Sequence, residues 1–170
     1  SYVLEYLSKY FDITVFYFNP NISPESEYIK RVNEVKRLIE EMPDCEDVKF
    51  LEGRYNPNEF YDCAKGLEDA PEGGERCLKC FRLRLRETAK AAAKAGSEYV
   101  CTTLTISPLK NADNLNKIGE EECEKLGLKW LPSDFKKKNG YKRSIELSRE
   151  YDLFRQNYCG CVFSKRNSVV

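Results

Sequence analysis

Residues 12–21 read Asp-Ile-Thr-Val-Phe-Tyr-Phe-Asn-Pro-Asn, and the expected fold is built outward from this segment. Its β-branched and aromatic residues form a near-continuous apolar run, which is typical of a strand buried in a parallel sheet. Asn19-Pro20-Asn21 then ends the strand in a turn. Ligands gather at the carboxyl ends of such strands, so Asn19 and Asn21 are candidate substrate-binding residues, although an ordinary turn would use the same residue types.

Helices and strands are expected to alternate along the rest of the chain. Apolar spacing and capping residues predict helices at about 3–7, 24–42, 57–65, 76–95 and 111–126, further strands at 48–51, 99–104 and 128–131, and loops with helical segments after 133. This order predicts an α/β fold of the doubly wound, Rossmann-like type, with a parallel sheet and helices on both faces. We expect residues 1–170 to form a single domain with a helical, cysteine-containing segment at 133–170.

Composition narrows the classes of function. The chain has 28 basic and 28 acidic residues, so net charge indicates no particular partner, although a basic stretch lies between residues 135 and 155. The longest apolar run, Val15 to Phe18, is far shorter than the ~20 residues of a membrane span, and no signal peptide begins the chain. We therefore expect a cytoplasmic protein with no membrane partner.

Cysteine usage points to metal or redox chemistry. Eight cysteines are many for a cytosolic chain of this size, and reducing conditions argue against structural disulfides. The sequence contains no His, which excludes within this chain a Ser-His-Asp triad, a Cys-His protease pair, Cys2His2 zinc and Rieske ligation. Metal ligands must therefore be thiolates or carboxylates.

Two cysteine pairs have the spacing of ligands. Cys77 and Cys80 lie at the predicted start of a helix, where the positive end of the helix dipole favours thiolate. In Cys159-Gly160-Cys161, the small Gly160 lets the backbone turn so that both sulfurs face one ion or cluster. We predict that these four thiolates meet at one metal centre. The other four cysteines have no partner at ligand spacing.

Ligand count alone suits tetrahedral zinc and a four-iron cluster alike. Structural zinc usually ties short segments together, whereas these pairs lie about eighty residues apart in a domain large enough to fold without metal. A redox role is therefore favoured. Two alternatives stay open: a zinc-stabilised nucleic-acid-binding module without catalysis, and a dithiol oxidoreductase, because CxxC pairs also occur in redox-active dithiols.

Several segments together resemble a known family. They are Phe16-Tyr17-Phe18-Asn19-Pro20-Asn21-Ile22, Lys65-Gly66-Leu67-Glu68, Pro71-Glu72-Gly73-Gly74-Glu75-Arg76-Cys77, Cys80-Phe81, Arg84-Leu85, Thr102-Thr103-Leu104 and Tyr158-Cys159-Gly160-Cys161. The pattern extends over almost the whole chain and resembles the cobalamin-independent epoxyqueuosine reductases. The Arg-Cys-x-x-Cys-Phe and Arg-Gln-x-Tyr-Cys-Gly-Cys segments, residues 76–81 and 155–161, are specific in combination.

The resemblance implies an iron-sulfur oxidoreductase of queuosine biosynthesis. Its reaction is the reductive removal of the epoxide oxygen from epoxyqueuosine at the wobble position of tRNA, giving queuosine. It further implies a 4Fe-4S cluster and an α/β fold of the adenine nucleotide alpha hydrolase-like type. The implied partners are the anticodon loop of tRNA carrying epoxyqueuosine and an electron donor that the sequence does not identify.

The sequence departs from the family in one place. The family opens with a strand leading into a Cys-Cys-x-Pro motif, and this chain begins at Ser1 without either. We expect the chain to be a fragment, or those residues to belong to the gene but not to the chain as given. With that pair restored, six thiolates would exceed what one four-iron cluster normally uses, so we expect a second metal ion, iron, or one thiol free for redox work.

Substrate contacts are expected at three places. Thr102, Thr103, Ser107 and Lys110 lie at a predicted strand end and are candidates for contacts to ribose or phosphate, although Ser-Pro is also an ordinary loop element. A surface for phosphates and a splayed anticodon base is predicted at Lys136, Lys137, Lys138, Tyr141, Arg143 and Arg155. A solvated charged face is the alternative. Tyr158, beside a ligand, is the candidate catalytic acid, or equally a packed aromatic residue.

Overall fold

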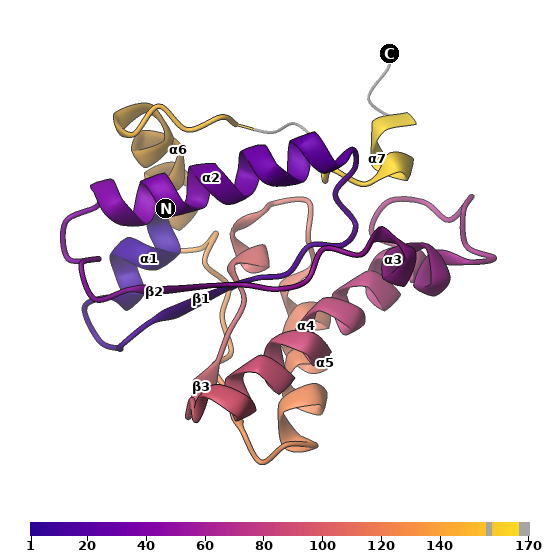
Figure 1. The fold of residues 1–170 in the computed structure, drawn as a ribbon, viewed down its shortest axis with the longest axis horizontal. Coiled ribbons are helices and arrows are strands. Elements are labelled where there is room, and N and C mark those ends of the chain that lie inside the picture. Colours follow the sequence, from indigo (N-terminus) through magenta and orange to yellow (C-terminus); the bar gives the residue numbers. More distant parts are fainter. Residues whose placement is uncertain (156–157, 167–170) are drawn as a thin grey trace. The chain divides into compact units, whose positions relative to one another are not determined.

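The computed structural model describes residues 1–155 and 158–166 (Figure 1). Contacts divide the chain into two compact units: unit 1 comprises Ser1–Pro57 and Asn139–Val170, and unit 2 comprises Asn58–Lys138. Each unit has its own core and is described by itself. The expectation that residues 1–170 form one domain stays a prediction.

Unit 1 is built around a strand-helix-strand motif. The apolar segment within residues 12–21 supplies β1. Strand β1 pairs in parallel with β2, with Thr14 opposite Lys49 and Tyr17 opposite Glu52. Helix α2 connects the two strands, as alternation predicts for a parallel pair. The elements of unit 1 are α1 (Tyr2–Leu7), β1 (Thr14–Tyr17), α2 (Glu25–Glu41), β2 (Lys49–Glu52), α6 (Gly140–Glu150) and α7 (Val162–Arg166).

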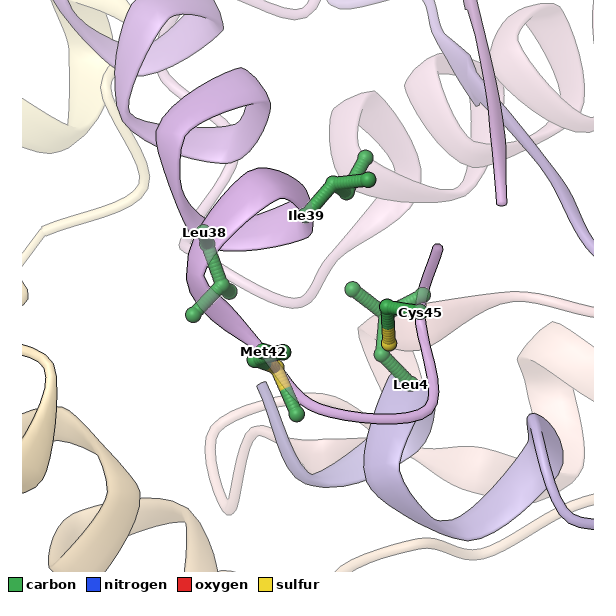
Figure 2. Packing of buried hydrophobic residues seen from close by; sticks show 5 residues of the cluster. All are labelled: Leu4, Leu38, Ile39, Met42 and Cys45. Atoms are coloured by element: carbon green, nitrogen blue, oxygen red, sulfur yellow. The ribbon is translucent and has the colours of Figure 1, made fainter. Parts of the chain in front are cut away.

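The core of unit 1 lies between α1, α2 and the strands. Figure 2 shows its central cluster, which consists of Leu4, Leu38, Ile39, Met42 and Cys45. Cys45 is only 1% exposed, so this isolated thiol is a core residue. A second cluster, formed by Ile22, Tyr28 and Val32, packs the start of α2 against Tyr17 and Tyr55. This cluster fixes the turn after β1.

Unit 2 contains the second parallel pair. Strand β3 pairs with β4, with Tyr99 opposite Lys129 and Val100 opposite Trp130. The elements are α3 (Pro57–Ala64), which begins at the boundary with unit 1, α4 (Glu75–Ala95), β3 (Tyr99–Val100), the 3-10 helix η1 (Thr103–Ile106), α5 (Ala112–Glu124) and β4 (Lys129–Trp130). Phe81 and Leu85 of α4 pack against Leu115 and Ile118 of α5.

The α/β class and the parallel pairing are confirmed, and two details differ from expectation. The described residues form two separate two-stranded sheets, so one Rossmann-like sheet with helices on both faces is not confirmed. The predicted strand 99–104 ends at Val100, because the side chain of Thr102 accepts a hydrogen bond from the Leu104 N–H at 3.2 Å and starts η1. Throughout 1–155 and 158–166, no helix combines the length and apolar character needed to cross a membrane.

Two thiols, the half-buried Cys101 and the buried Cys123, should make unit 2 sensitive to alkaline pH. Burial raises the pKa of Cys101 and of Cys123 to about 11, and the charge of Glu122 adds to the effect on Cys123. A thiol ionises near ~8.5 in an unfolded chain, so the unfolded state loses protons first as pH rises. The stabilisation is present below pH ~8.5 and is lost progressively up to pH ~11.

We expect the free energy of unfolding of reduced, metal-free protein to fall between pH 9 and 11, by at most about 1.4 kcal/mol per pH unit for each thiol. Urea unfolding at pH 8 and pH 10.5 measures this fall. Other groups also titrate there, so Cys123→Ala is compared with the wild type. The fall should be smaller in the variant, and equal falls in both proteins would contradict this assignment to Cys123.

Candidate metal centre

The Cys77 and Cys80 pair lies at the beginning of α4 in unit 2, as predicted. Cys77 is in the first turn, and its sulfur accepts a hydrogen bond from the backbone N–H of Gly73 at 3.3 Å. Gly73 has φ +84°, a conformation that side chains rarely adopt, so glycine is required for this turn. Cys80 follows one turn later and is buried.

Arg76 anchors the loop that leads into this pair. Its side chain is only 3% exposed, and its Nη1 donates to the carbonyl oxygens of Leu67 at 3.1 Å, Glu68 at 2.9 Å and Ala70 at 2.6 Å. One guanidinium group therefore satisfies three backbone acceptors of a loop that has little apolar packing of its own. The position of Cys77 depends on this arrangement, because Cys77 is the next residue.

The Cys159-Gly160-Cys161 pair lies in unit 1, directly before α7. A hydrogen bond with Cys159 and burial raise the pKa of the Cys161 thiol far above its usual range, so the two sulfurs lie within hydrogen-bond reach of one another. The backbone N–H of Cys159 donates to Ser164 Oγ at 2.9 Å, and the carbonyl of Gly160 accepts from the Ser23 N–H at 3.0 Å. These contacts hold both thiols on one side of a tight turn.

Asn21 is brought to this pair, whereas Asn19 forms the turn beside it. Asn21 is 2% exposed, its Nδ2 donates to Cys159 Sγ at 3.9 Å, and among the described residues its Oδ1 has no hydrogen-bond partner. The carbonyl of Asn19 accepts from the Ile22 N–H at 3.2 Å. The Asn-Pro-Asn segment thus serves as a turn and also places one amide against a thiol.

Arg31 of α2 is a neighbour of this pair that sequence reasoning missed. Its Nη1 donates to the carbonyl of Cys159 at 3.3 Å, and its guanidinium lies 5.5 Å from the ring centroid of Tyr158. A signal was available, because Arg31 interrupts the apolar stripe that includes Tyr28 and Val32. A charged residue at a core position of a helix indicates a specific polar partner.

The two cysteine pairs belong to different units. Within each unit, the described residues bring no group of three or more His, Cys, Asp or Glu side chains together as metal ligands. All eight cysteines lie in the described part of the chain, and none forms a disulfide. The meeting of Cys77, Cys80, Cys159 and Cys161 at one centre stays a prediction. The thiol pairs and the unpartnered buried polar atoms beside Cys159 fit a thiolate-bound metal group.

Thr102, Thr103 and Ser107 lie in and around η1, and their role in substrate binding stays a prediction. Thr102 is buried and caps η1, Thr103 is exposed, and Ser107 Oγ accepts from the Leu109 N–H at 3.3 Å. Lys110 follows and lines a surface depression of about 470 Å³. The hydrogen bond by which Thr102 caps η1 is enough to explain why this polar side chain is buried.

Lys136 and Lys137 line the same depression as Lys110. Their segment is fixed by Thr105, which hydrogen bonds to Ser133 Oγ at 3.1 Å and accepts from the Phe135 N–H at 3.4 Å. Asp134 pairs with Lys136 at 2.7 Å and with Lys137 at 3.3 Å. Three lysines are therefore held around one concave surface of unit 2.

The predicted basic stretch is divided at the boundary of the units. Lys138 ends unit 2, and Tyr141, Arg143 and Arg155 belong to unit 1. Arg143 pairs with Glu5 and thereby joins α6 to α1, so much of its charge has a structural use. Arg155 lies over the ring of Tyr141 at 5.7 Å from the centroid. Gln156 of the predicted motif is outside the described residues.

Comparisons with known proteins give one consistent result. The family described as epoxyqueuosine reductase QueH matches residues 1–167. Curated relatives with that name include a protein of Streptococcus pyogenes serotype M1, 45% identical over 168 residues, and one of Staphylococcus epidermidis, 44% identical over 168 residues. A protein of Thermotoga maritima with the same name is 38% identical over 156 residues.

The chain is shorter than these relatives. The matches cover 98%, 96% and 90% of this chain, and 66%, 71% and 79% of the streptococcal, staphylococcal and Thermotoga proteins, respectively. The chain therefore spans about two thirds to four fifths of the length of each relative.

Proposed function

Because the chain belongs to the epoxyqueuosine reductase QueH family, we propose that it reduces epoxyqueuosine in tRNA to queuosine. In this reaction both carbon–oxygen bonds of the epoxide break, a carbon–carbon double bond forms, and the oxygen leaves as water. Two electrons and two protons balance the change. The observation that carries the proposal is the pair of adjacent thiols at Cys159 and Cys161, inside a family match that covers 1–167.

We propose that Cys77, Cys80, Cys159 and Cys161 hold a 4Fe-4S cluster. Thiolates are the usual ligands of such clusters, and each pair stands on a rigid element or a tight turn. A cluster held there would supply electrons singly to the substrate. A second iron ion is proposed for the complete site, on the strength of the further Cys-Cys motif that the family carries.

The protein's own side chains would bind and protonate the substrate. Tyr158 adjoins the ligand Cys159, and we propose its hydroxyl group as the donor of a proton to the departing oxygen. The buried amide oxygen of Asn21 has no hydrogen-bond partner among the described residues, and we propose that it accepts from a hydroxyl group of the substrate. Asn19 is proposed as a further contact from the same turn.

Anaerobic single-turnover reduction tests the proposal. Reduced, reconstituted full-length protein should convert epoxyqueuosine in tRNA to queuosine, as measured by nucleoside mass spectrometry. Iron-loaded protein that leaves epoxyqueuosine unchanged would contradict the proposed reaction. Colourless protein with one zinc and unchanged substrate would favour a nucleic-acid-binding module, and metal-free active protein would favour a dithiol oxidoreductase.

The lysine-lined depression is proposed to contact tRNA phosphates. Lys110, Lys136 and Lys137 converge on it, and phosphates are the sequence-independent part of a nucleic-acid interface. Thr103, Ser107 and Lys138 are proposed to flank this surface. Tyr141 with Arg155 is proposed as a stacking platform for a base, because the guanidinium already lies over the ring, and Arg143 is proposed to add charge beside it.

Replacing Lys110, Lys136 and Lys137 together by Ala should weaken tRNA binding about tenfold or more at physiological salt. The slope of log K against log salt should fall by about one for each phosphate that a lysine no longer neutralises. Filter binding or fluorescence anisotropy at several salt concentrations measures both quantities. Lys90→Ala with Lys125→Ala is the control, because these lysines of unit 2 also pair with carboxylates, those of Glu87 and Glu122, but are not among the residues that line the depression. An unchanged slope would remove the depression from the interface.

A further inference from the structure

We propose that Arg31 is a positioning residue for the metal centre, which clamps the Cys159–Cys161 turn and directs one N–H group at the bound sulfur atoms. The proposal rests on the proposed function, because it takes Cys159 and Cys161 as metal ligands. Arg31 comes from α2, more than a hundred residues before the turn that it contacts. Nothing in the spacing of the cysteines indicates it.

The contacts of Arg31 determine its geometry. Its Nε donates to Glu27 Oε1 at 2.8 Å one turn earlier on α2, which fixes the side chain along the helix. Nη1 then donates to the carbonyl of Cys159 at 3.3 Å, and the guanidinium lies over the ring of Tyr158. The group therefore contacts two consecutive residues of the turn.

Because Gly160 has no side chain, it leaves room for this guanidinium. A Cβ atom at residue 160 would lie 2.9 Å from Arg31 Nη1 and 3.0 Å from Nη2, and the residue has φ +100°. The backbone conformation favours glycine, and a side chain at this position would force the guanidinium to move. The guanidinium of Arg31 thus packs directly against the backbone of the Cys159–Cys161 turn.

One donor atom of this buried arginine, Nη2, makes no recorded hydrogen bond. Arg31 is 8% exposed, and Nη2 has no hydrogen-bond partner among the described residues. Buried donors are rarely unpaired, because losing water without a replacement is costly. Nη2 lies beside Gly160, the residue between Cys159 and Cys161 in the sequence, so a metal group bound by these two thiolates would be a suitable acceptor. Hydrogen bonds to the sulfurs of such a group are a known means of tuning it.

Arg37 provides a matched control on the same helix. It also pairs with a glutamate one turn away, Glu41 at 2.8 Å, and donates to a backbone carbonyl near the C-terminal end, that of Tyr151 at 3.0 Å. Its side chain is 40% exposed, and its recorded hydrogen bonds go to Glu41, Tyr151 and Asp152. Arg37 therefore shares the glutamate and backbone contacts of Arg31, but it lacks the burial of Arg31 and its contacts with Tyr158 and Cys159.

The test compares Arg31→Met, Arg31→Lys and Arg37→Met with the wild type in the full-length protein. The first measurement is amide hydrogen exchange of residues 158–164 in metal-free protein. The second is the rate at which a chelator removes iron after anaerobic reconstitution. Arg31→Met should exchange and lose iron at least about tenfold faster, in line with the removal of a partner of metal ligands. Arg31→Lys should lie between it and the wild type, and Arg37→Met should match the wild type.

The outcomes separate the role of Arg31 at the metal centre from a purely structural role. Equal behaviour of Arg31→Met and Arg37→Met in both measurements overturns the inference, and so does faster exchange without faster iron loss, because Arg31 would then hold the turn without serving the metal. If the wild-type protein takes up no iron, the proposed function is contradicted instead. The exchange measurement on metal-free protein then still tests whether Arg31 holds the Cys159–Cys161 turn. Arg31→Lys keeps the charge and much of the volume, so it supplies the comparison if Arg31→Met fails to fold.

Discussion

Cys159→Ala should lower single-turnover reduction of epoxyqueuosine by more than about 100-fold, because even the removal of a partner of a metal ligand costs 10- to 100-fold. Cys159 is proposed as a direct ligand, and it also accepts from Asn21 and lies beside Cys161. The substitution removes the sulfur and leaves the backbone contacts to Arg31 and Ser164 in place. Nucleoside analysis gives the activity, and iron analysis on the same sample gives the metal content.

Cys63→Ala is the control for this substitution. Cys63 is half-buried in α3 and has no partner at ligand spacing, so its replacement should leave iron content and activity close to those of the wild type. Wild-type iron content in Cys159→Ala would show that this residue is not a ligand. Loss of activity in both variants would point to instability rather than to ligation.

Arg76→Met should lower the free energy of unfolding by about 3 kcal/mol, because it removes a donor from three backbone carbonyls, and among the described residues only that of Leu67 keeps another donor, the Ala70 N–H at 3.1 Å. A carbonyl that loses its donor and stays buried costs about 1–3 kcal/mol. The carbonyls are those of Leu67, Glu68 and Ala70. The loop before α4 should loosen, and iron content should fall with it, because Cys77 is the next residue. Denaturant unfolding of metal-free protein measures the first effect and iron analysis the second.

Arg86→Met on the same helix is the matched control. Its side chain is 49% exposed and lies 3.8 Å from Glu87, so its replacement should change stability by no more than about 0.5 kcal/mol. If Arg76→Met is as stable as Arg86→Met, the three hydrogen bonds do not hold the loop. If Arg76→Met is unstable yet binds iron normally, the loop does not position Cys77.

The helices and the parallel pairing could be predicted because local signals and tertiary packing agree. The apolar run at 12–18 supplies β1, and the glycine at residue 96 ends α4 with φ +70°. The end of β3 could not be predicted in the same way. Thr102 is β-branched and suits a strand, but its side chain caps η1 instead. A competing hydrogen bond of this kind has no signature in apolar spacing.

The local position of each cysteine pair could be predicted from the sequence, and its surroundings could not. The spacing of Cys77 with Cys80 and of Cys159 with Cys161 is local, and the structure places each pair on a helix start or a tight turn. Contacts between distant segments are invisible to spacing. Arg31 reaches Cys159 across 128 positions, and Arg143 reaches Glu5 across 138. The charge of Arg143 looked available for tRNA, although a carboxylate from the other end of the chain already pairs with it.

The central claim is that these cysteines hold an iron-sulfur cluster in a reductase of modified tRNA. Iron, acid-labile sulfide and zinc per chain, measured on anaerobically purified full-length protein, test it most directly. We predict a brown protein with about four iron and four sulfide per chain for the cluster, plus about one iron for a second metal ion. The double variant Cys77→Ala with Cys80→Ala should lose most of its iron and most of its sulfide. About one zinc per chain, with neither iron nor sulfide, would contradict the claim.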